Sequence, residues 1–204
     1  MSRYRLLRRT REVSAAIRKE KGSSCGSILD IGTADGMMLS LLQQSIIIRE
    51  SFGLDLSTEL LKTNTNQSIS LVQGDALSLP FKDCSFDIVI GAAVIEHVPD
   101  PRIMIREIKR VLKRDGICVI TTPHPFFDSI ARRIGHLPRE NHISTYKLWQ
   151  LTDLLSSVNL KTLTTRRFML SPIGSIPFED ELEQAIRTMR LSFLMCNQII
   201  VSRK

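Results

Sequence analysis

Apolar and polar residues alternate along this chain in blocks of two lengths. Short apolar runs, with the length and composition of strands covered on both faces, occur at 28–31, 51–55, 70–75, 86–91 and 117–122. Longer stretches with helical spacing lie between them, most clearly at 101–114 and more briefly at 37–42. Strands that alternate with helices predict an open, doubly wound, mostly parallel sheet with helices on both faces.

The 101–114 segment has start and stop signals as well as a period. Asp100 offers an N-cap, Pro101 suits the first helical position, and Gly116 is expected just past the helix end. The C-terminal part predicts, in order, a helix at 146–158, an extended segment at 161–168, a helix at 179–190 and a last strand at 194–202. The 179–190 helix is acidic at its start and basic at its end, which suits the helix dipole.

The net charge of +7 is concentrated at one end of the 204-residue chain. Residues 1–22 hold eight Lys or Arg and two Glu, so they carry most of the excess. Leu6, Val13 and Ile17 fall on one helical stripe, which predicts a basic amphipathic helix leaning on the domain, its charged face solvated. Contact with an anionic surface is the alternative. Aromatic residues make up only 5%, so platforms for stacking nucleic-acid bases are scarce and RNA binding is disfavoured.

Several classes of protein are excluded by what the chain lacks. No apolar run reaches the roughly 18 residues of a membrane span, and the Arg-rich start lacks the apolar region of a secretory signal. The cysteines are widely separated, at Cys25, Cys84, Cys118 and Cys196, with no Cys-x-x-Cys pair. This spacing supports neither a zinc site nor a disulfide framework, so we expect a cytoplasmic protein without a structural metal.

The segment 28–36 carries the most informative chemistry. An apolar run ends in Asp30, Gly32 and Gly36 mark a turn, and a helix follows, an arrangement that lets backbone approach a nucleotide-like ligand. The next two strands also end in acids, Asp55 and Asp75. Because ligands of parallel sheets bind beyond the carboxyl ends of the strands, these acids together predict a nucleoside site. A dinucleotide fingerprint fails, since its second and third glycines are replaced, so a nicotinamide oxidoreductase is disfavoured.

In these motifs the chain resembles class I S-adenosylmethionine-dependent methyltransferases, of the small type 11 group that includes quinone-biosynthesis enzymes. The resemblance runs in order through 28–36, 53–57, 74–81, 85–89, 94–101, 110–116, 122–123 and 142–155. It implies a Rossmann-like, seven-stranded sheet with an antiparallel last strand, and S-adenosylmethionine as cofactor. It also implies a single methyltransferase domain over 1–204, with variable substrate-side segments at 123–141 and 171–190.

Carried over position by position, the resemblance implies a cofactor site at the ends of four strands. The residues around the methionine part are Asp30, Gly32, Thr33, Ala34 and Gly36. Those at the ribose and adenine are Asp55, Leu56, Asp75 and Ala76, and those near the sulfonium are Ala92 and Ala93. Two residues depart from the family pattern. Ala34 replaces a glycine, which is tolerable at a negative φ, and Ala93 replaces a residue that is often polar.

Methyl transfer is an in-line displacement that mainly requires alignment of the reacting atoms. A general base is needed only for a protonated nucleophile such as a hydroxyl, and His124 and His142 are the candidates. We expect a small-molecule acceptor, methylated at a hydroxyl oxygen, with a lipid-linked acceptor at a membrane surface as a variant. An RNA (tRNA) methyltransferase that uses the basic helix, and a non-catalytic S-adenosylmethionine-binding module, are the alternatives. We interpret Glu96 and His97 as structural.

Overall fold

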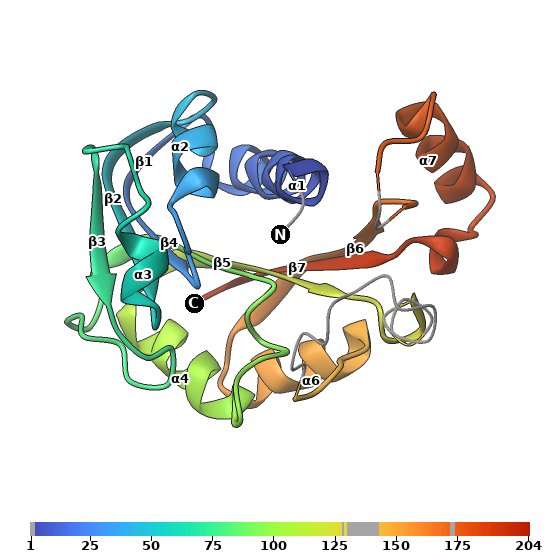
Figure 1. Ribbon diagram of the computed structural model, residues 1–204. Helices are drawn as coiled ribbons and strands as arrows, with labels where there is room; N and C mark the ends of the chain where they lie inside the picture. Colours follow the sequence, from blue (N-terminus) through green and yellow to red (C-terminus); the bar gives the residue numbers. More distant parts are fainter. Residues whose placement is uncertain (1–2, 128, 130–142, 172–173) are drawn as a thin grey trace.

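The computed structural model describes residues 3–127, 129, 143–171 and 174–204 and contains one seven-stranded sheet (Figure 1). The strands are β1 (Ser24–Ile31), β2 (Ile47–Asp55), β3 (Ile69–Gln73), β4 (Phe86–Ala92), β5 (Leu112–Pro123), β6 (Lys161–Phe168) and β7 (Asn197–Arg203). Their order is β3-β2-β1-β4-β5-β7-β6, and β7 runs antiparallel to both of its neighbours while the pairs among β1–β5 are parallel. The predicted fold class is confirmed.

Helices cover both faces of the sheet, as Figure 1 shows. They are α1 (Arg3–Lys21), α2 (Met37–Gln43), α3 (Thr58–Leu61), α4 (Pro101–Val111), α6 (Leu148–Ser157) and α7 (Glu179–Thr188), with a 3₁₀ turn, η1 (Ser192–Leu194), before β7. Side chains of α1 and α2 pack in one core cluster and those of α4 and α6 in the other. α7 extends beyond these layers, past β6 and β7.

The strand order places a crevice at the centre of the sheet. β1 pairs with β2 on one side and with β4 on the other, so the chain reverses its direction of travel across the sheet at β1. Connections that leave in opposite directions open a gap at the carboxyl ends of these two strands, where ligands of such sheets bind. The turn after β1, which holds Gly32, therefore lies at the predicted binding edge.

The predicted boundary between α4 and β5 is wrong. α4 ends at Val111, and β5 begins at the next residue rather than at Ile117. Gly116 is thus inside a strand and not past a helix end, and the register of β4 and β5 shifts between Phe86 and Ile88. Lack of space for a side chain explains the glycine at this position, because a Cβ on Gly116 would lie 2.9 Å from the carbonyl oxygen of Lys113.

The basic helix forms as predicted, but its charged face is not simply solvated. Val13 and Ile17 are fully buried against the sheet, and Arg8 and Arg9 on the same helix are buried too. Arg8 forms ion pairs with three acids of α7, which are Glu179, Asp180 and Glu183. The acidic start of α7 suits the dipole of its own helix, as the sequence predicts, but the fold also uses the acids of this helix to neutralise a buried arginine.

Further contacts make this ion cluster a bridge between distant parts of the chain. The hydroxyl of Tyr4 donates to Glu179, and Arg11 donates two hydrogen bonds to Asp180. Glu183 also accepts from the backbone N–H of Met169. α1 and α7 are therefore joined by charge-assisted hydrogen bonds, which are stronger than neutral ones. Among the described helices, none combines the length and apolarity that a bilayer span requires.

The substitution Glu183→Gln should lower the free energy of unfolding by at least about 2 kcal/mol, because it leaves the buried Arg8 charge under-compensated. Arg11→Ala is the matched control, because its ion pair is exposed and should contribute less than about 1 kcal/mol. Urea denaturation followed by circular dichroism measures both. Equal losses in the two variants would contradict a special role for the buried pair.

Candidate functional site

The turn after β1 has a backbone shape that restricts its residues. Gly32 and Gly36 have φ values of 71° and 74°, in the left-handed region where glycine is favoured. At Gly32 space is also limiting, because a Cβ would lie 2.3 Å from Cγ2 of Val94. The backbone N–H groups of Gly32 and Thr33 both donate to the carbonyl oxygen of Leu54, at 2.7 and 3.0 Å. The turn is thus fixed against the end of β2.

An alanine at position 34 is tolerable at a negative φ, but the structure does not meet this condition. Its φ is +51°, so the methyl group sits in the left-handed region. A residue with a Cβ costs roughly 1–2 kcal/mol in that conformation. The backbone N–H of Ala34 donates to Oδ2 of Asp55 at 2.8 Å, and this bond helps to hold the strained conformation.

Asp55 connects two segments of the site. While Oδ2 accepts from Ala34, Oδ1 accepts from the backbone N–H of Ser57 at 2.9 Å. An ionised carboxylate has about four lone-pair positions, so both oxygens can still accept bonds from a ligand. Leu56, the next residue, has a side chain that is 68% exposed and stands at the rim of the site.

A cavity of about 350 Å³ lies at the carboxyl ends of β1, β2, β3 and β4. The predicted site residues that line it are Gly32, Asp55, Leu56, Asp75, Ala76 and Ala93. Those that lie outside its lining are Asp30, Thr33, Ala34, Gly36 and Ala92, which shape the turn or the strand ends behind it. Oδ1 of Asp75 accepts a hydrogen bond from the backbone N–H of Leu77, and the side chain of Asp75 is exposed. The fold therefore brings the acids of β2 and β3 to one cavity.

Some residues that line the cavity were not among the predicted site residues. The turn between β4 and α4 contributes Val94, His97, Val98 and Pro99, and the loop after β3 contributes Leu77. These residues are mainly apolar and most of them lie just before the predicted helix, so their type gives little signal. Only the position of the stretch, directly after a parallel strand, could have pointed to the site.

Asp30 is a buried acid behind the turn. Its side chain is 2% exposed, and burial raises the pKa of its carboxyl to about 7. The hydroxyl of Thr33 acts in the opposite direction, and the nearby charge of Asp55 raises the pKa further. The carboxyl is therefore close to half protonated at neutral pH, and a cation placed near it would favour its ionised form.

Glu96 is a second buried acid, and its contacts support the structural interpretation. Its Oε2 accepts from the hydroxyl of Thr122, and its backbone oxygen accepts from the N–H groups of Ile143 and Ser144. Burial raises the pKa of Glu96, although the charge of Arg9 acts against this. Glu96 thus connects the β4–α4 turn with the end of β5 and with the segment that leads to α6.

His124 follows β5 but does not line the cavity. Its Nδ1 accepts from the backbone N–H of Phe126 at 3.3 Å, so the neutral ring carries its proton on Nε2. Burial lowers the pKa of His124, and the charges of Arg167 and Lys147 act the same way. His142 and most of the 123–141 segment lie outside the described residues. Within the described part of the chain, no cluster of three His, Cys, Asp or Glu side chains could hold a metal ion.

The comparisons with known proteins agree on one family. A family model described as a methyltransferase domain matches residues 29–120. The chain is 30% identical over 136 residues to the uncharacterized methyltransferase YcgJ of Bacillus subtilis, covering 60% of this chain and 53% of that protein. It is 37% identical over 116 residues to demethylmenaquinone methyltransferase of Staphylococcus carnosus, covering 53% and 46%. The chain spans about half the length of these curated relatives.

A similar solved structure extends the fold comparison over the whole chain. An S-adenosylmethionine-dependent methyltransferase of Thermotoga maritima, described as a possible histamine N-methyltransferase, superimposes with a TM-score of 0.76. The identity is 17%, and the superposition covers 99% of this chain and 90% of the other. At this identity the likeness establishes the fold and not the substrate.

The substitution Ala34→Gly should raise the free energy of unfolding by about 0.5–1 kcal/mol, because glycine removes the left-handed strain. The control is Ala15→Gly on the exposed side of α1, which should lower it by about 0.5–1 kcal/mol because glycine weakens a helix interior. Thermal and urea denaturation of both variants measure the difference. A destabilised Ala34→Gly variant would refute the strain at this position.

Asp30 should make stability fall as the pH rises. In the unfolded chain its carboxyl ionises near pH 4, whereas in the folded protein it holds its proton to about pH 7. Its favourable contribution is therefore complete below about pH 4 and is lost between there and about pH 7, by up to about 1.4 kcal/mol per pH unit. Asp30→Asn removes this dependence. Urea denaturation of both proteins across that range should give diverging curves; parallel curves would contradict the raised pKa.

Proposed function

Because the chain carries a methyltransferase domain of the class I, S-adenosylmethionine-dependent family, we propose that it transfers a methyl group from S-adenosylmethionine to a small-molecule acceptor, at a hydroxyl oxygen. The observation that carries the proposal is the cavity at the reversal point of the sheet, where Asp55 and Asp75 lie beside the glycine turn. Its volume of about 350 Å³ falls within the range of small-molecule sites.

The residues of the cavity fit the parts of this cofactor. In the proposed arrangement Asp55 accepts hydrogen bonds from the two ribose hydroxyls, for which it has lone pairs left. Leu56 packs on one face of the adenine, while Asp75 and the backbone of Ala76 meet its edge. The methionine part would lie along the turn at Gly32, and its ammonium group would favour the ionised form of the buried Asp30 carboxyl behind that turn.

The chemistry supplied by the cofactor is a methyl group made electrophilic by positively charged sulfur. With the cofactor bound, the residues around the cavity would have to hold the acceptor oxygen in line with that methyl group. The acceptor's hydroxyl proton must pass to a base. His124 suits this role poorly because its Nδ1 is engaged, and we assign it the donation of a hydrogen bond to the acceptor through Nε2. His142 stays a proposal, outside the described residues.

The contacts of the chain bear on two alternative functions, an RNA methyltransferase and a non-catalytic binding module. An RNA methyltransferase would need the cations of α1 free to bind phosphates, yet Arg8 is buried and Arg11 is bound to Asp180. A non-catalytic binding module has one argument, the methyl group of Ala93 at a position where the family often has a polar side chain. Ala93 lines the cavity, and its lack of a polar group leaves the alignment of acceptor and methyl group possible, while the proton of a hydroxyl acceptor would have to pass to another residue.

Cofactor binding is tested by titrating S-adenosylhomocysteine into the protein in a calorimeter. We expect micromolar-range binding in the intact protein and at least about tenfold weaker binding by Asp55→Asn, which weakens acceptance from the ribose. Asp83→Asn is the matched control: Asp83 is an exposed acid that pairs with Arg110 and is not part of the cavity lining. Absence of binding in the intact protein, or equal binding by both variants, would refute the proposed cofactor site.

The methyl-transfer step needs a separate readout. Methyl-labelled S-adenosylmethionine incubated with the protein and a small-molecule extract of cells should give a labelled product that the Asp55→Asn variant does not form. Binding without a labelled product would favour the binding module. A label found only in RNA would favour the RNA methyltransferase.

A further inference from the structure

A row of polar side chains crosses the sheet at the carboxyl end of β5. Thr122 of β5 lies opposite Gln198 of β7, and Gln198 lies opposite Arg167 of β6. Register partners in antiparallel strands place their side chains on the same face of the sheet. Two positions before Thr122 and two after Gln198, Ile120 and Ile200 belong to the core cluster that includes α6. The row therefore lies on the face of the sheet that α6 covers.

The side-chain amide of Gln198 joins this row to two segments outside the sheet. Gln198 is fully buried, and its Nε2 donates to the carbonyl oxygens of Pro123, at 3.1 Å, and Tyr146, at 2.7 Å. His124 and Lys147 are the residues that follow these two acceptors in the chain. One buried amide thus brings a histidine and a lysine to the end of the row at which Arg167 lies opposite Gln198.

We call Lys147, Arg167 and His124 the donor cluster. Burial lowers the pKa of His124, and the charges of Arg167 and Lys147 lower it further, as expected of cations that lie close to the ring. Among the residues that the structure describes, no acid forms an ion pair with Lys147 or Arg167. Lys147 is exposed at the N-cap of α6, where a cation opposes the helix dipole. The positive charge of the cluster is therefore available to a ligand.

Two buried polar atoms of the row are not hydrogen-bonded within the part of the chain that the structure describes. They are Oε1 of Gln198 and Nε of Arg167. These atoms belong to register partners, yet the donor and the acceptor do not bond to each other. Buried polar groups of proteins are normally hydrogen-bonded, so the two atoms indicate a place where a further polar group fits.

The donor cluster lies next to the proposed cofactor cavity. Ala93 lines that cavity, and its backbone N–H donates to the carbonyl oxygen of Thr121 at 2.8 Å. The next residue of β5, Thr122, donates to Glu96 of the same β4–α4 turn at 3.0 Å. His124 follows two positions later. A molecule that reaches from Ala93 to His124 therefore crosses only the end of β5.

Aromatic side chains lie beside His124. The ring of Phe127 packs edge to face on the ring of His124, with their centroids 5.8 Å apart, and Phe126 packs in the same way on Phe127 at 5.3 Å. Phe126 is 62% exposed. These rings offer an apolar contact beside the donor cluster, which suits a molecule with an apolar body and a charged end.

We propose that the methyl acceptor is an organic anion, a hydroxyl compound with an apolar body and a carboxylate or phosphate group. Arg167 and Lys147 bind the anionic group, and Nε2 of His124 donates a hydrogen bond to it. Hydrogen bonds between cations and carboxylate or phosphate oxygens are roughly twice as strong as neutral ones. The inference rests on the proposed function for the methyl transfer and adds to it the chemical class of the acceptor.

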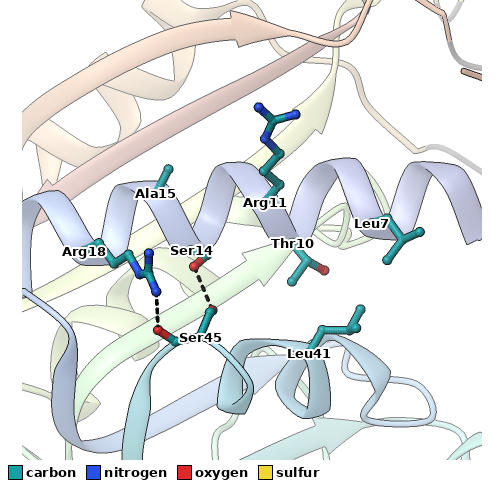
Figure 2. A pocket seen from close by; sticks show the side chains of 8 residues that line it. All are labelled: Leu7, Thr10, Arg11, Ser14, Ala15, Arg18, Leu41 and Ser45. Atoms are coloured by element: carbon teal, nitrogen blue, oxygen red, sulfur yellow. Dashed lines mark hydrogen bonds between the residues drawn. The ribbon is translucent and has the colours of Figure 1, made fainter. Parts of the chain in front are cut away.

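The groove between α1 and α2 also contains two arginines, but they are engaged within the protein (Figure 2). Arg18 donates to the backbone oxygen of Ser45, and the hydroxyls of Ser14 and Ser45 bond to each other. The side chain of Arg11 points out of the groove and pairs with Asp180. The donor cluster is therefore the better site for an anion.

The test is nuclear magnetic resonance of the His124 ring in the full chain, titrated with benzoate, phenyl phosphate and benzamide. His124→Asn identifies the signal among those of the four histidines. Benzoate or phenyl phosphate should shift the signal in a saturable way, and the neutral benzamide should bind at least about tenfold more weakly than the better anion. The stronger of the two anions identifies the anionic group as carboxylate or phosphate.

Variants of the two cations connect the binding with the donor cluster. Lys147→Gln and Arg167→Gln should each weaken binding of the stronger anion at least about tenfold. Lys161→Gln is the matched control, because Lys161 is an exposed cation at the opposite end of the strand that holds Arg167, and its loss should change the affinity less than about twofold. The Lys147 side chain is exposed, so Lys147→Gln tests the site even where Arg167→Gln does not fold.

Two results would overturn the inference. One is equal binding of benzamide and the anions, or binding of none of the probes. The other is an equal loss of affinity in Lys161→Gln and the cluster variants, which would leave net charge as the cause of binding. The titrations are made both without cofactor and with S-adenosylhomocysteine. Anion binding by a protein that does not bind S-adenosylhomocysteine would refute the acceptor role together with the proposed function, whereas S-adenosylhomocysteine binding without anion binding would refute this inference alone.

Discussion

The binding edge of this protein depends on the contact between the turn after β1 and the end of β2. Leu54 accepts two backbone hydrogen bonds from the turn, and Asp55 accepts a third from Ala34 while it also holds Ser57. These bonds satisfy backbone donors that would otherwise be orphaned beside an open cavity. Because Asp55 is both a structural acceptor and a cavity-lining residue, the shape of the glycine turn and the position of the carboxylate proposed to bind the ligand are set together.

The sequence predicted the features that depend on local pattern. The sheet, its alternation with helices and the acids at the strand ends follow from apolar runs and turn residues, and they are present in the structure. Features that depend on distant partners were missed. The left-handed φ of Ala34 is stabilised by an acceptor on β2, and the strand that starts at Leu112 is imposed by pairing with Phe86. Neither partner is visible from the residues nearby.

The basic residues of α1 are a second feature whose distant partners could not be predicted from the sequence. A cluster of arginines near one end of a sequence suggests a polyanion, because each cation is counted without its partner. In the folded chain Arg8 and Arg11 are matched by acids of α7, and Arg18 and Lys21 donate to backbone oxygens of Ser45 and Asp115.

The separation between Arg8 and Glu183, which is 175 positions, has a consequence for synthesis on the ribosome. α1 leaves the exit tunnel well before α7, which carries the carboxylates that neutralise the buried arginine of α1. A buried cation without its partner is strongly unfavourable, so α1 can form early as a helix but can dock fully only when α7 has emerged. The docking of α1 is thus completed only after a helix far along the chain has been made.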